Sequence, residues 1–278
     1  MKWRCREVEF VFPRPAVVMG ILNVTPDSFS DGGQFVDVAK AVVHAQKMLS
    51  VGAEIIDIGG ESTRPGAPEV SAADEIARVL PVIKQLKAET TAVISIDTQK
   101  PDVARAALES GAQIVNDIAA NREDDAMWRL VAETGAGYVA MHMQGTPQTM
   151  QANPQYADVV AEVNEFFTDR LQRLAAAGVS SDQTALDVGI GFGKTLEHNL
   201  QLLAGMRHFT KHQRPVLLGV SRKSFMGRLL GLEVNERLPA VLACTVDAIG
   251  QGASIIRTHD VAETCRAIRM AEAIYQKR

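Results

Sequence analysis

The sequence predicts a single-domain α/β protein that folds as a (β/α)8 barrel over residues 1–278. Apolar, β-branched runs alternate with amphipathic helical stretches eight times along the chain. The runs are continuously apolar, which is typical of parallel strands that are covered on both faces. A polar or charged residue follows each run, at the strand end where barrels carry their active sites. An open, doubly wound sheet is the alternative fold.

Eight short runs are predicted to form the strands. They are rich in Val, Ile and Leu and are bounded by polar or glycine residues. In chain order they are Ala16–Leu22, Glu54–Ile58, Ala92–Asp97, Gln113–Asp117, Gly137–His142, Thr184–Val188, Pro215–Val220 and Ala253–Thr258. The first run passes directly into a glycine-rich loop that holds one large aromatic residue, Phe29, and the pair Gly32-Gly33. This composition predicts a mobile lid that carries a stacking group.

Three of the intervening stretches show clear helical periodicity. They are Asp37–Val51, Ala72–Leu86 and Asp158–Ala177, each with apolar residues spaced to form one inward face. Ser71 and Asp74 form a predicted N-cap pair for the second helix. Glycines mark the expected helix ends, at Gly52, Gly111, Gly135 and Gly178.

Composition excludes several classes of function. The net charge is −4 and no basic run is present, so we expect no nucleic-acid partner. No apolar run is long enough to span a membrane, and the first residues lack the apolar segment of a signal peptide. The three cysteines are far apart and odd in number, which argues against a disulfide framework or a zinc site. We therefore expect a soluble, cytoplasmic protein.

The residues at the strand ends divide into two chemical groups. The first group combines two carboxylates, an amide and an ammonium, and consists of Asp97, Asn116, Asp187 and Lys223. Carboxylates accept hydrogen bonds from ring N–H and amino groups, while the amide and the ammonium donate, so this group suits a flat, nitrogen-rich heterocycle. Met141 and Phe192 could pack on the faces of such a ring. A salt bridge between Asp97 and Lys223 with a purely structural role is the alternative.

The second group suits an anion. It consists of Asn23, Ser221, Arg257 and His259. Arginine offers a planar fork of donors that matches phosphate oxygens. Ser221 follows the seventh predicted strand, and Arg257 and His259 lie at the end of the eighth, where barrels often bind phosphate. Asn23 could also offer its oxygen to a hard cation.

Two motifs are rejected on their spacing. The run Gly189–Thr195 resembles a phosphate-binding GxxxxGK[ST] loop, but the first glycine of that pattern is replaced by Val188. His142 and His259 have no further ligand at metal-binding spacing on the same element, so they do not predict a zinc site. We expect His142 to be a hydrogen-bonded histidine at a strand end.

Long motifs distributed along the chain resemble those of the dihydropteroate synthase family. They are Gly20–Gly33, Gly59–Gly66, Ser95–Thr98, Asn116–Ile118, Met141–Gly145, Gly191–Lys194, Ser221–Ser224 and Arg257–Asp260. The resemblance implies a (β/α)8 barrel, usually a homodimer and a target of sulfonamides. It also implies a Mg2+-assisted reaction that joins 6-hydroxymethyl-7,8-dihydropterin diphosphate to 4-aminobenzoate and releases diphosphate.

The resemblance also assigns roles to individual residues. The pterin is expected on Asp97, Asn116, Met141, Asp187, Phe192 and Lys223. The diphosphate is expected on Asn23, Thr63, Arg257 and His259, with Asn23 also ligating Mg2+. The aminobenzoate is expected among Phe29, Arg64, Pro65 and Ser221. Catalysis would rest on Asp97, Lys223 and Arg257.

Two departures and two alternatives accompany this resemblance. Val188 and Ile190 stand where relatives usually have proline and often an aromatic residue, which could loosen Asp187 and trim the wall of the site. The alternatives are a pterin-dependent methyltransferase on the same barrel and a non-catalytic pterin-binding protein. Neither requires the complete set of anion-binding residues together with Phe29.

Overall fold

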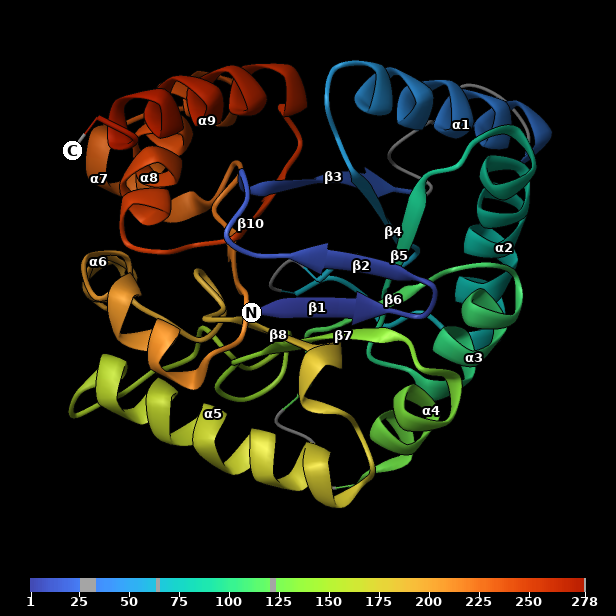
Figure 1. The fold of residues 1–278 in the computed structure, drawn as a ribbon, viewed down its shortest axis with the longest axis horizontal. Coiled ribbons are helices and arrows are strands. Elements are labelled where there is room, and N and C mark those ends of the chain that lie inside the picture. Colours follow the sequence, from blue (N-terminus) through green and yellow to red (C-terminus); the bar gives the residue numbers. More distant parts are fainter. Residues whose placement is uncertain (26–33, 64–65, 121–123, 278) are drawn as a thin grey trace.

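The structure is a computed structural model of the 278-residue chain, and it describes residues 1–25, 34–63, 66–120 and 124–277. Its centre is a closed barrel in which every strand pairs in parallel, in the order β10-β3-β4-β5-β6-β7-β8-β9 (Figure 1). Strand β10 pairs with both β3 and β9, which closes the sheet. The predicted barrel is thus confirmed, and the open sheet is excluded.

The barrel strands lie close to their predicted positions. They are β3 (Val17–Asn23), β4 (Ile55–Gly59), β5 (Val93–Asp97), β6 (Ile114–Asp117), β7 (Gly137–Met141), β8 (Thr184–Asp187), β9 (Val216–Gly219) and β10 (Ile255–Thr258). Most predicted strands were one or two residues too long at an end. Some of the extra residues, such as Gln113 and His142, still donate a backbone hydrogen bond to the neighbouring strand. A two-stranded hairpin, β1 (Lys2–Cys5) with β2 (Val8–Val11), precedes the barrel.

Helices follow the strands and form the outer layer. The α-helices are α1 (Gln34–Ser50), α2 (Ala72–Glu89), α3 (Pro101–Glu109), α4 (Ala126–Thr134), α5 (Val159–Ala176), α6 (Leu196–Ala204), α7 (Ser224–Leu230), α8 (Leu238–Gly250) and α9 (Val261–Tyr275). Short 3-10 turns are η2 (Ser181–Gln183), η3 (Met206–His212) and η4 (Val234–Glu236). The three predicted helices correspond to α1, α2 and α5. Ser71 caps α2 as expected, accepting a hydrogen bond from the Asp74 amide at 3.1 Å.

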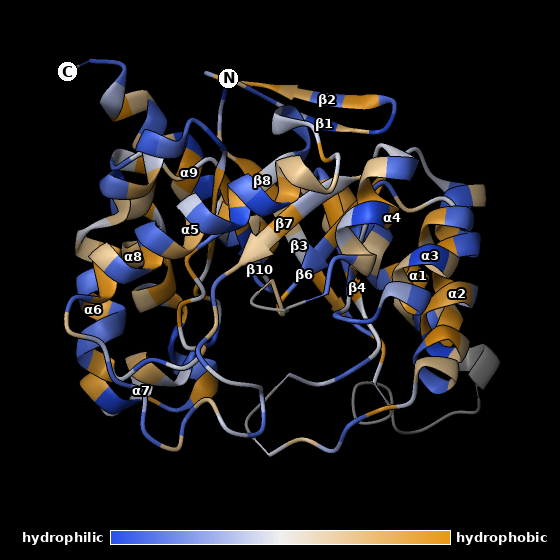
Figure 2. Cartoon of the chain, turned by 90° about the horizontal axis from the view of Figure 1, so that it is seen from below, coloured by the Kyte–Doolittle hydropathy of each residue, from blue (hydrophilic) through white to orange (hydrophobic). Residues whose placement is uncertain are grey.

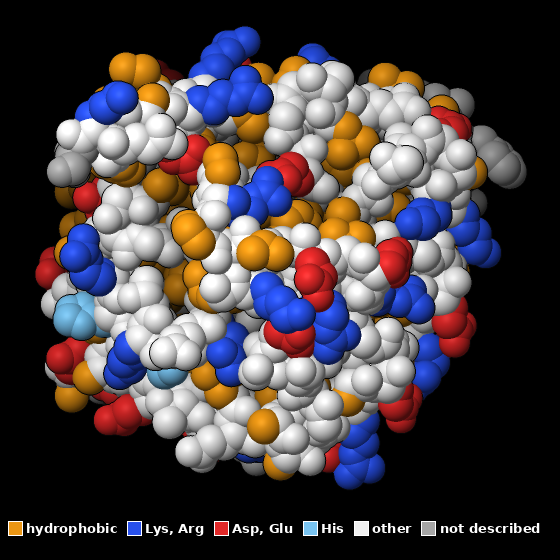
Figure 3. All heavy atoms as spheres, viewed as in Figure 1, with side chains coloured by type: hydrophobic (Ala, Val, Ile, Leu, Met, Phe, Trp, Pro, Cys, Tyr) orange, Lys and Arg blue, Asp and Glu red, His pale blue; other side chains and the backbone are white. Residues whose placement is uncertain are grey.

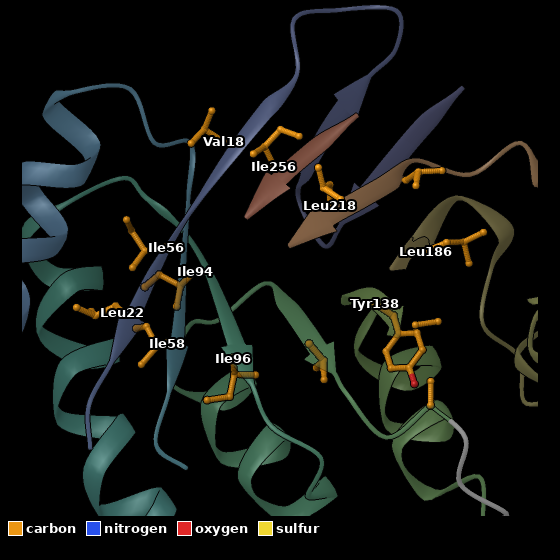
Figure 4. Packing of buried hydrophobic residues seen from close by; sticks show 14 of the residues in the cluster. Val18, Leu22, Ile56, Ile58, Ile94, Ile96, Tyr138, Leu186, Leu218 and Ile256 are labelled. Carbon is orange, nitrogen blue, oxygen red and sulfur yellow. The ribbon is translucent and has the colours of Figure 1, made fainter. Parts of the chain in front are cut away.

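The main core lies between the barrel and the helices. Alternate residues of each strand point outward into it, among them Val18, Ile56, Ile94 and Leu218 (Figure 4). The residues between them point inward and fill the barrel axis, among them Met19, which is fully buried. Because side chains alternate along a strand, this sorting also decides which strand-end residues face the barrel interior.

The β1–β2 hairpin closes one end of the barrel, opposite the long loops that follow the strands (Figure 2). Trp3 and Phe10 pack in the cluster that fills the barrel axis, and the Trp3 indole donates to the Gln183 carbonyl at 2.8 Å. Figure 3 looks onto this end, where basic and acidic side chains lie side by side. Arg4, for example, pairs with Asp182 at 3.1 Å. The hairpin blocks this end, so a ligand must approach from the other.

No helix in the described part of the chain is long and apolar enough to cross a membrane.

Candidate active site

The strand-end residues come together through the two-residue period of the strands. Counting in twos from the inward residues of the barrel axis leads to Asn23 on β3, Asp97 on β5, Asn116 on β6, Asp187 on β8 and Arg257 on β10. These side chains therefore share one ring at the C-terminal end of the barrel, which we call the barrel mouth. Asp117 has the opposite parity and points outward, where it accepts a hydrogen bond from the Tyr138 hydroxyl at 2.8 Å.

Arg257 is the centre of an ion-pair network in the barrel mouth. Its Nε donates to Asp57 Oδ2 at 2.6 Å, and its Nη2 donates to Asp97 Oδ2 at 2.5 Å. The Asn116 amide donates to the same Asp57 oxygen at 3.0 Å. The second Asp57 oxygen is buried without a hydrogen-bond partner. Asp57 was missed by the sequence analysis, although a carboxylate inside the apolar run Ile55–Ile58 was a usable signal.

Two ionisable side chains of the barrel mouth, Asp97 and Lys223, have pKa values close to neutral pH. Burial, with a smaller contribution from Asp57, raises the pKa of Asp97 to about 7, although Arg257 and Lys223 act in the opposite direction. Burial lowers the pKa of Lys223 to about 8, opposed by Asp187 and Asp97. Both groups therefore change charge close to neutral pH, which is frequent among residues of active sites.

Lys223 and the loop after β8 form the opposite wall. The Lys223 ammonium lies 4.0 Å from the centre of the Phe192 ring, a cation–π contact. Phe192 packs against a buried cluster that contains Met141. Asp187 accepts a hydrogen bond from the Gly189 amide at 2.8 Å, so this carboxylate is held even though Val188 replaces proline. Burial raises the pKa of Asp187.

Ser221 and His259 form a hydrogen-bonded pair on the anion side. The His259 amide donates to Ser221 Oγ at 3.1 Å, and the same hydroxyl lies 2.9 Å from His259 Nδ1. The Ser221 hydroxyl can donate its own proton to Nδ1 while it accepts from the amide, and we infer this arrangement, which leaves the ring proton on Nε2. Burial and the cations Arg222 and Arg257 lower the pKa of His259 to about 3. His259 is therefore a neutral donor at physiological pH.

Thr63, the remaining described residue of the predicted anion group, follows β4 and is half-buried. The base of its loop is held by an ion triad of which Glu75 is fully buried and Lys100 and Glu61 are partly buried. Lys100 donates to Glu61 at 2.6 Å and to Glu75 at 2.7 Å, and Glu61 in turn accepts from the Val70 amide at 2.8 Å. Phe29, Arg64 and Pro65 lie outside the described residues.

Lys194 is a buried cation that the sequence analysis named in a rejected loop motif and in the family motif Gly191–Lys194, without giving it a role. Its ammonium lies 3.0 Å from His142 Nδ1 and donates to the Phe192 carbonyl at 2.9 Å. His142 is thus a hydrogen-bonded histidine, as expected. The signal for Lys194 in the sequence was its place at the end of these glycine-rich motifs.

The fold and this ring of acidic, amide and basic groups define a pterin-binding enzyme. Residues 19–259 match the family described as "Pterin binding enzyme". Within that class, the dihydropteroate synthase of Escherichia coli (strain K12) is 51% identical over 256 residues, which cover 92% of this chain and 90% of that protein. The chain belongs to the dihydropteroate synthase family, whose members are transferases of folate biosynthesis.

Solved structures support the same assignment. A Yersinia pestis dihydropteroate synthase in a sulfonamide drug complex is 46% identical, with a TM-score of 0.92 over 99% of this chain and 100% of that one. A Xanthomonas albilineans dihydropteroate synthase with 4-aminobenzoic acid is 42% identical, with a TM-score of 0.91 over 99% of this chain and 98% of that one.

Proposed function

We propose that the barrel mouth binds 6-hydroxymethyl-7,8-dihydropterin diphosphate and joins its methylene carbon to the amine of 4-aminobenzoate, releasing diphosphate. The observation that carries this proposal is the Asp57–Arg257–Asp97 network, which lies beside Asn116 in a ring that also holds Asp187. Membership of the synthase family and a relative solved with 4-aminobenzoic acid support it.

The pterin is proposed to lie across the inward acids. Asp97 and Asp187 accept hydrogen bonds from ring N–H and amino groups, and Asn116 can both donate and accept. Lys223 donates to a ring oxygen or nitrogen. Met141 is buried and Phe192 half-buried in one apolar cluster, which supports a role for them as the surface under the ring face.

The diphosphate is proposed to bind between Asn23, Thr63, Arg257 and His259. Arg257 uses the Nε–H and one Nη2–H for carboxylates, so its two Nη1–H groups and the second Nη2–H are the donors left for phosphate oxygens. His259 contributes a neutral Nε2–H donor. The burial and the two acidic partners of Arg257 support a role in which it both steadies the acids and contacts the leaving group.

Mg2+ is proposed as the cofactor, with Asn23 as its protein ligand. The Asn23 amide oxygen faces the position where a Cβ on Gly59 would lie, at 3.7 Å, so the absent side chain leaves space at the mouth. The described residues contain no cluster of three His, Cys, Asp or Glu side chains able to hold a metal. A single amide oxygen fits Mg2+, which is commonly bound through substrate phosphates and water. When bound, the ion would neutralise charge on the departing diphosphate.

The 4-aminobenzoate is proposed to bind beside the diphosphate, among Phe29, Arg64, Pro65 and Ser221. Only Ser221 lies in the described part of the chain, and its hydroxyl already engages His259. We therefore infer that Ser221 acts chiefly by orienting His259. Its position just beyond β9 (Val216–Gly219) supports a place for it between the two proposed substrate sites.

The reaction is proposed to begin with cleavage of the C–O bond between the pterin methylene and the diphosphate. Diphosphate leaves with the bonding electron pair, and Arg257 and His259 stabilise its charge. The ionised Asp97 stabilises the positive charge that develops on the pterin through hydrogen bonds to ring N–H groups. The arylamine nitrogen then attacks the methylene, and the new C–N bond is completed by loss of a proton to water. A neutral arylamine is already nucleophilic, so no strong base is required.

The experiment is an assay of diphosphate release by the purified protein with Mg2+, with and without 4-aminobenzoate. We expect release that requires 4-aminobenzoate and equals the dihydropteroate formed. Binding of the pterin without any release would overturn the proposal in favour of a non-catalytic protein. Dependence on Mg2+ is checked in the same assay by adding EDTA and then restoring the metal.

We also propose a cytoplasmic homodimer. Cys5, Cys244 and Cys265 are all free thiols, as expected in a reducing compartment. Leu229 and Leu230, at the end of α7, are about half exposed and are the apolar surface that supports self-association. Sedimentation equilibrium distinguishes a dimer from a monomer.

A further inference from the structure

Lys194 is a fully buried cation whose three donors all have acceptors. The side chain is 1% exposed. Its ammonium approaches His142 Nδ1 at 3.0 Å, the Phe192 carbonyl at 2.9 Å and the His142 carbonyl at 3.3 Å. An ammonium has three N–H donors, so this arrangement matches the protonated form. Such complete pairing is needed because an unpaired buried charge is costly.

These bonds join two loops of the barrel mouth. His142 follows β7, and Phe192 belongs to the loop after β8. Gly189 lies so close to the His142 carbonyl that a Cβ there would come within 1.9 Å of the oxygen. The loop after β8 is also held by Gln151, which donates to the Gly191 carbonyl at 2.8 Å, and by Tyr156, which donates to the Gly193 carbonyl at 2.9 Å. Lys194 is the charged member of this set.

The same loop presents the Phe192 ring to Lys223. Lys194 fixes the Phe192 carbonyl, while the Lys223 ammonium lies 4.0 Å from the ring centre. A Cβ on Gly191 would come within 3.1 Å of the Lys223 side chain. The position of Lys223 therefore depends on a loop whose backbone is held by the hydrogen bond from Lys194 to the Phe192 carbonyl.

Lys194 also contributes charge to the pterin site. Burial lowers the pKa of Lys194 to about 7, and the neighbouring Asp187 opposes this shift. In their charged forms Lys223 and Lys194 both lower the pKa of Asp187, against the effect of burial. The other titratable groups beside Lys194 are His142, which it contacts, and Tyr156 with its neighbour His198 on α6. Burial lowers the pKa of His142 and raises that of Tyr156, so both stay neutral near pH 7.

We propose that Lys194 is a positioning residue of the pterin site, which holds Phe192 and Lys223 in place. This inference rests on the proposed function for the identity of the ligand. Because Lys194 is only 1% exposed and its donors are taken by protein acceptors, it is not expected to touch the pterin.

The test compares Lys194→Met with a control of similar stability loss, Leu174→Ala, which lies in the outer core near the end of α5. Lys194→Met is expected to raise the KM for the pterin diphosphate about tenfold, the effect of misplacing the one charged hydrogen bond that Lys223 donates to the pterin. The KM for 4-aminobenzoate should change less than twofold. In Leu174→Ala both KM values should match the wild type. Equal changes in both KM values of Lys194→Met would overturn the proposal.

A second pair of variants keeps the test decisive if Lys194→Met does not fold. His142→Asn retains an acceptor near the position of Nδ1, and His142→Phe removes it. We expect a pterin KM near wild type in the first and a raised one in the second. Equal KM values in the two variants would contradict the proposal.

Amide hydrogen exchange over residues 187–195 separates this inference from the proposed function, because it requires no substrate. Exchange there should accelerate in Lys194→Met and in His142→Phe, but not in Leu174→Ala. Unchanged exchange would refute the positioning role. If the wild type forms no dihydropteroate but the variants show these changes in exchange, only the proposed function would be refuted.

Discussion

Arg257 Nη2 lies 2.5 Å from Asp97 Oδ2, across a barrel in which the two residues belong to β10 and β5. The strands β3 and β4 stand between them in the sheet. The contact is therefore made across the barrel interior, and it joins the residue proposed to stabilise the pterin to one proposed to bind the diphosphate. Asp57 completes the network from β4.

Activity should show a narrow optimum in pH. The pKa of Asp97 is about 7, and its active form is the carboxylate, so kcat/KM for the pterin diphosphate should rise as pH increases through about 7. The pKa of Lys223 is about 8, and its active form is the ammonium, so kcat/KM should fall above about 8. Steady-state kinetics from pH 5.5 to about 9.5 check this. Lys223→Arg should move the alkaline limb out of range; an unmoved limb would exclude Lys223 as its source.

Asp97 should reduce stability at neutral pH. Its pKa in the folded protein is about 7, whereas that of an unfolded aspartate is about 4. Between these values the folded state holds a proton that the unfolded state has released, so the free energy of unfolding falls as pH rises. Asp97→Asn removes this contribution, by about 1.4 kcal/mol for each unit of pKa difference. Urea unfolding of both proteins at several pH values should show that the free energy of unfolding of the variant increases relative to that of the wild type as pH rises. A difference that does not change with pH would contradict this.

His259 should remain neutral with its proton on Nε2. Nitrogen-detected NMR of labelled protein should show an unprotonated Nδ1 and no titration above pH about 5, given a pKa of about 3. Ser221→Ala removes the hydroxyl that orients the ring and should populate the other tautomer. A histidine that titrates near its ordinary pKa of about 6.5 would show that it can supply positive charge to the diphosphate after all.

Lys100 should support both stability and the loop that carries Thr63. Lys100→Met leaves Glu61 and Glu75 without their counter-charge, so the free energy of unfolding should fall by about 3 kcal/mol. The matched control, Lys84→Met, removes an exposed lysine of α2 and should change it by less than about 0.5 kcal/mol. Urea unfolding of the two variants checks the difference. Equal losses would show that the triad is not a significant anchor.

The barrel and most of its mouth were predictable because they follow from local rules. The apolar runs predicted the strands, and the polar residues at the ends of these runs predicted the ring of side chains at the barrel mouth. The two-residue period of a strand means that Asn116 points inward and its neighbour Asp117 points outward. Two adjacent residues cannot be told apart in this way until the position of the core is known. The departure at Val188 proved compatible with a fixed Asp187, because the Gly189 amide holds the carboxylate.

Features that depend on contacts distant in sequence were not predictable. The hairpin β1–β2 has only short, partly charged strands, and it is stabilised by packing of Trp3 and Phe10 against the barrel axis. Asp57 interacts with Arg257, 200 positions away. Lys194 is buried because a glycine-rich loop folds over it, which its neighbours in the sequence do not reveal.

The most direct test of the proposed mechanism is the turnover of Asp97→Asn with both substrates, measured beside its thermal unfolding. We predict that kcat falls by about 100-fold or more, the usual effect of removing a group that stabilises transition-state charge, while the variant stays folded at the assay temperature. A folded Asp97→Asn variant that keeps wild-type turnover would contradict a role for this carboxylate in the reaction.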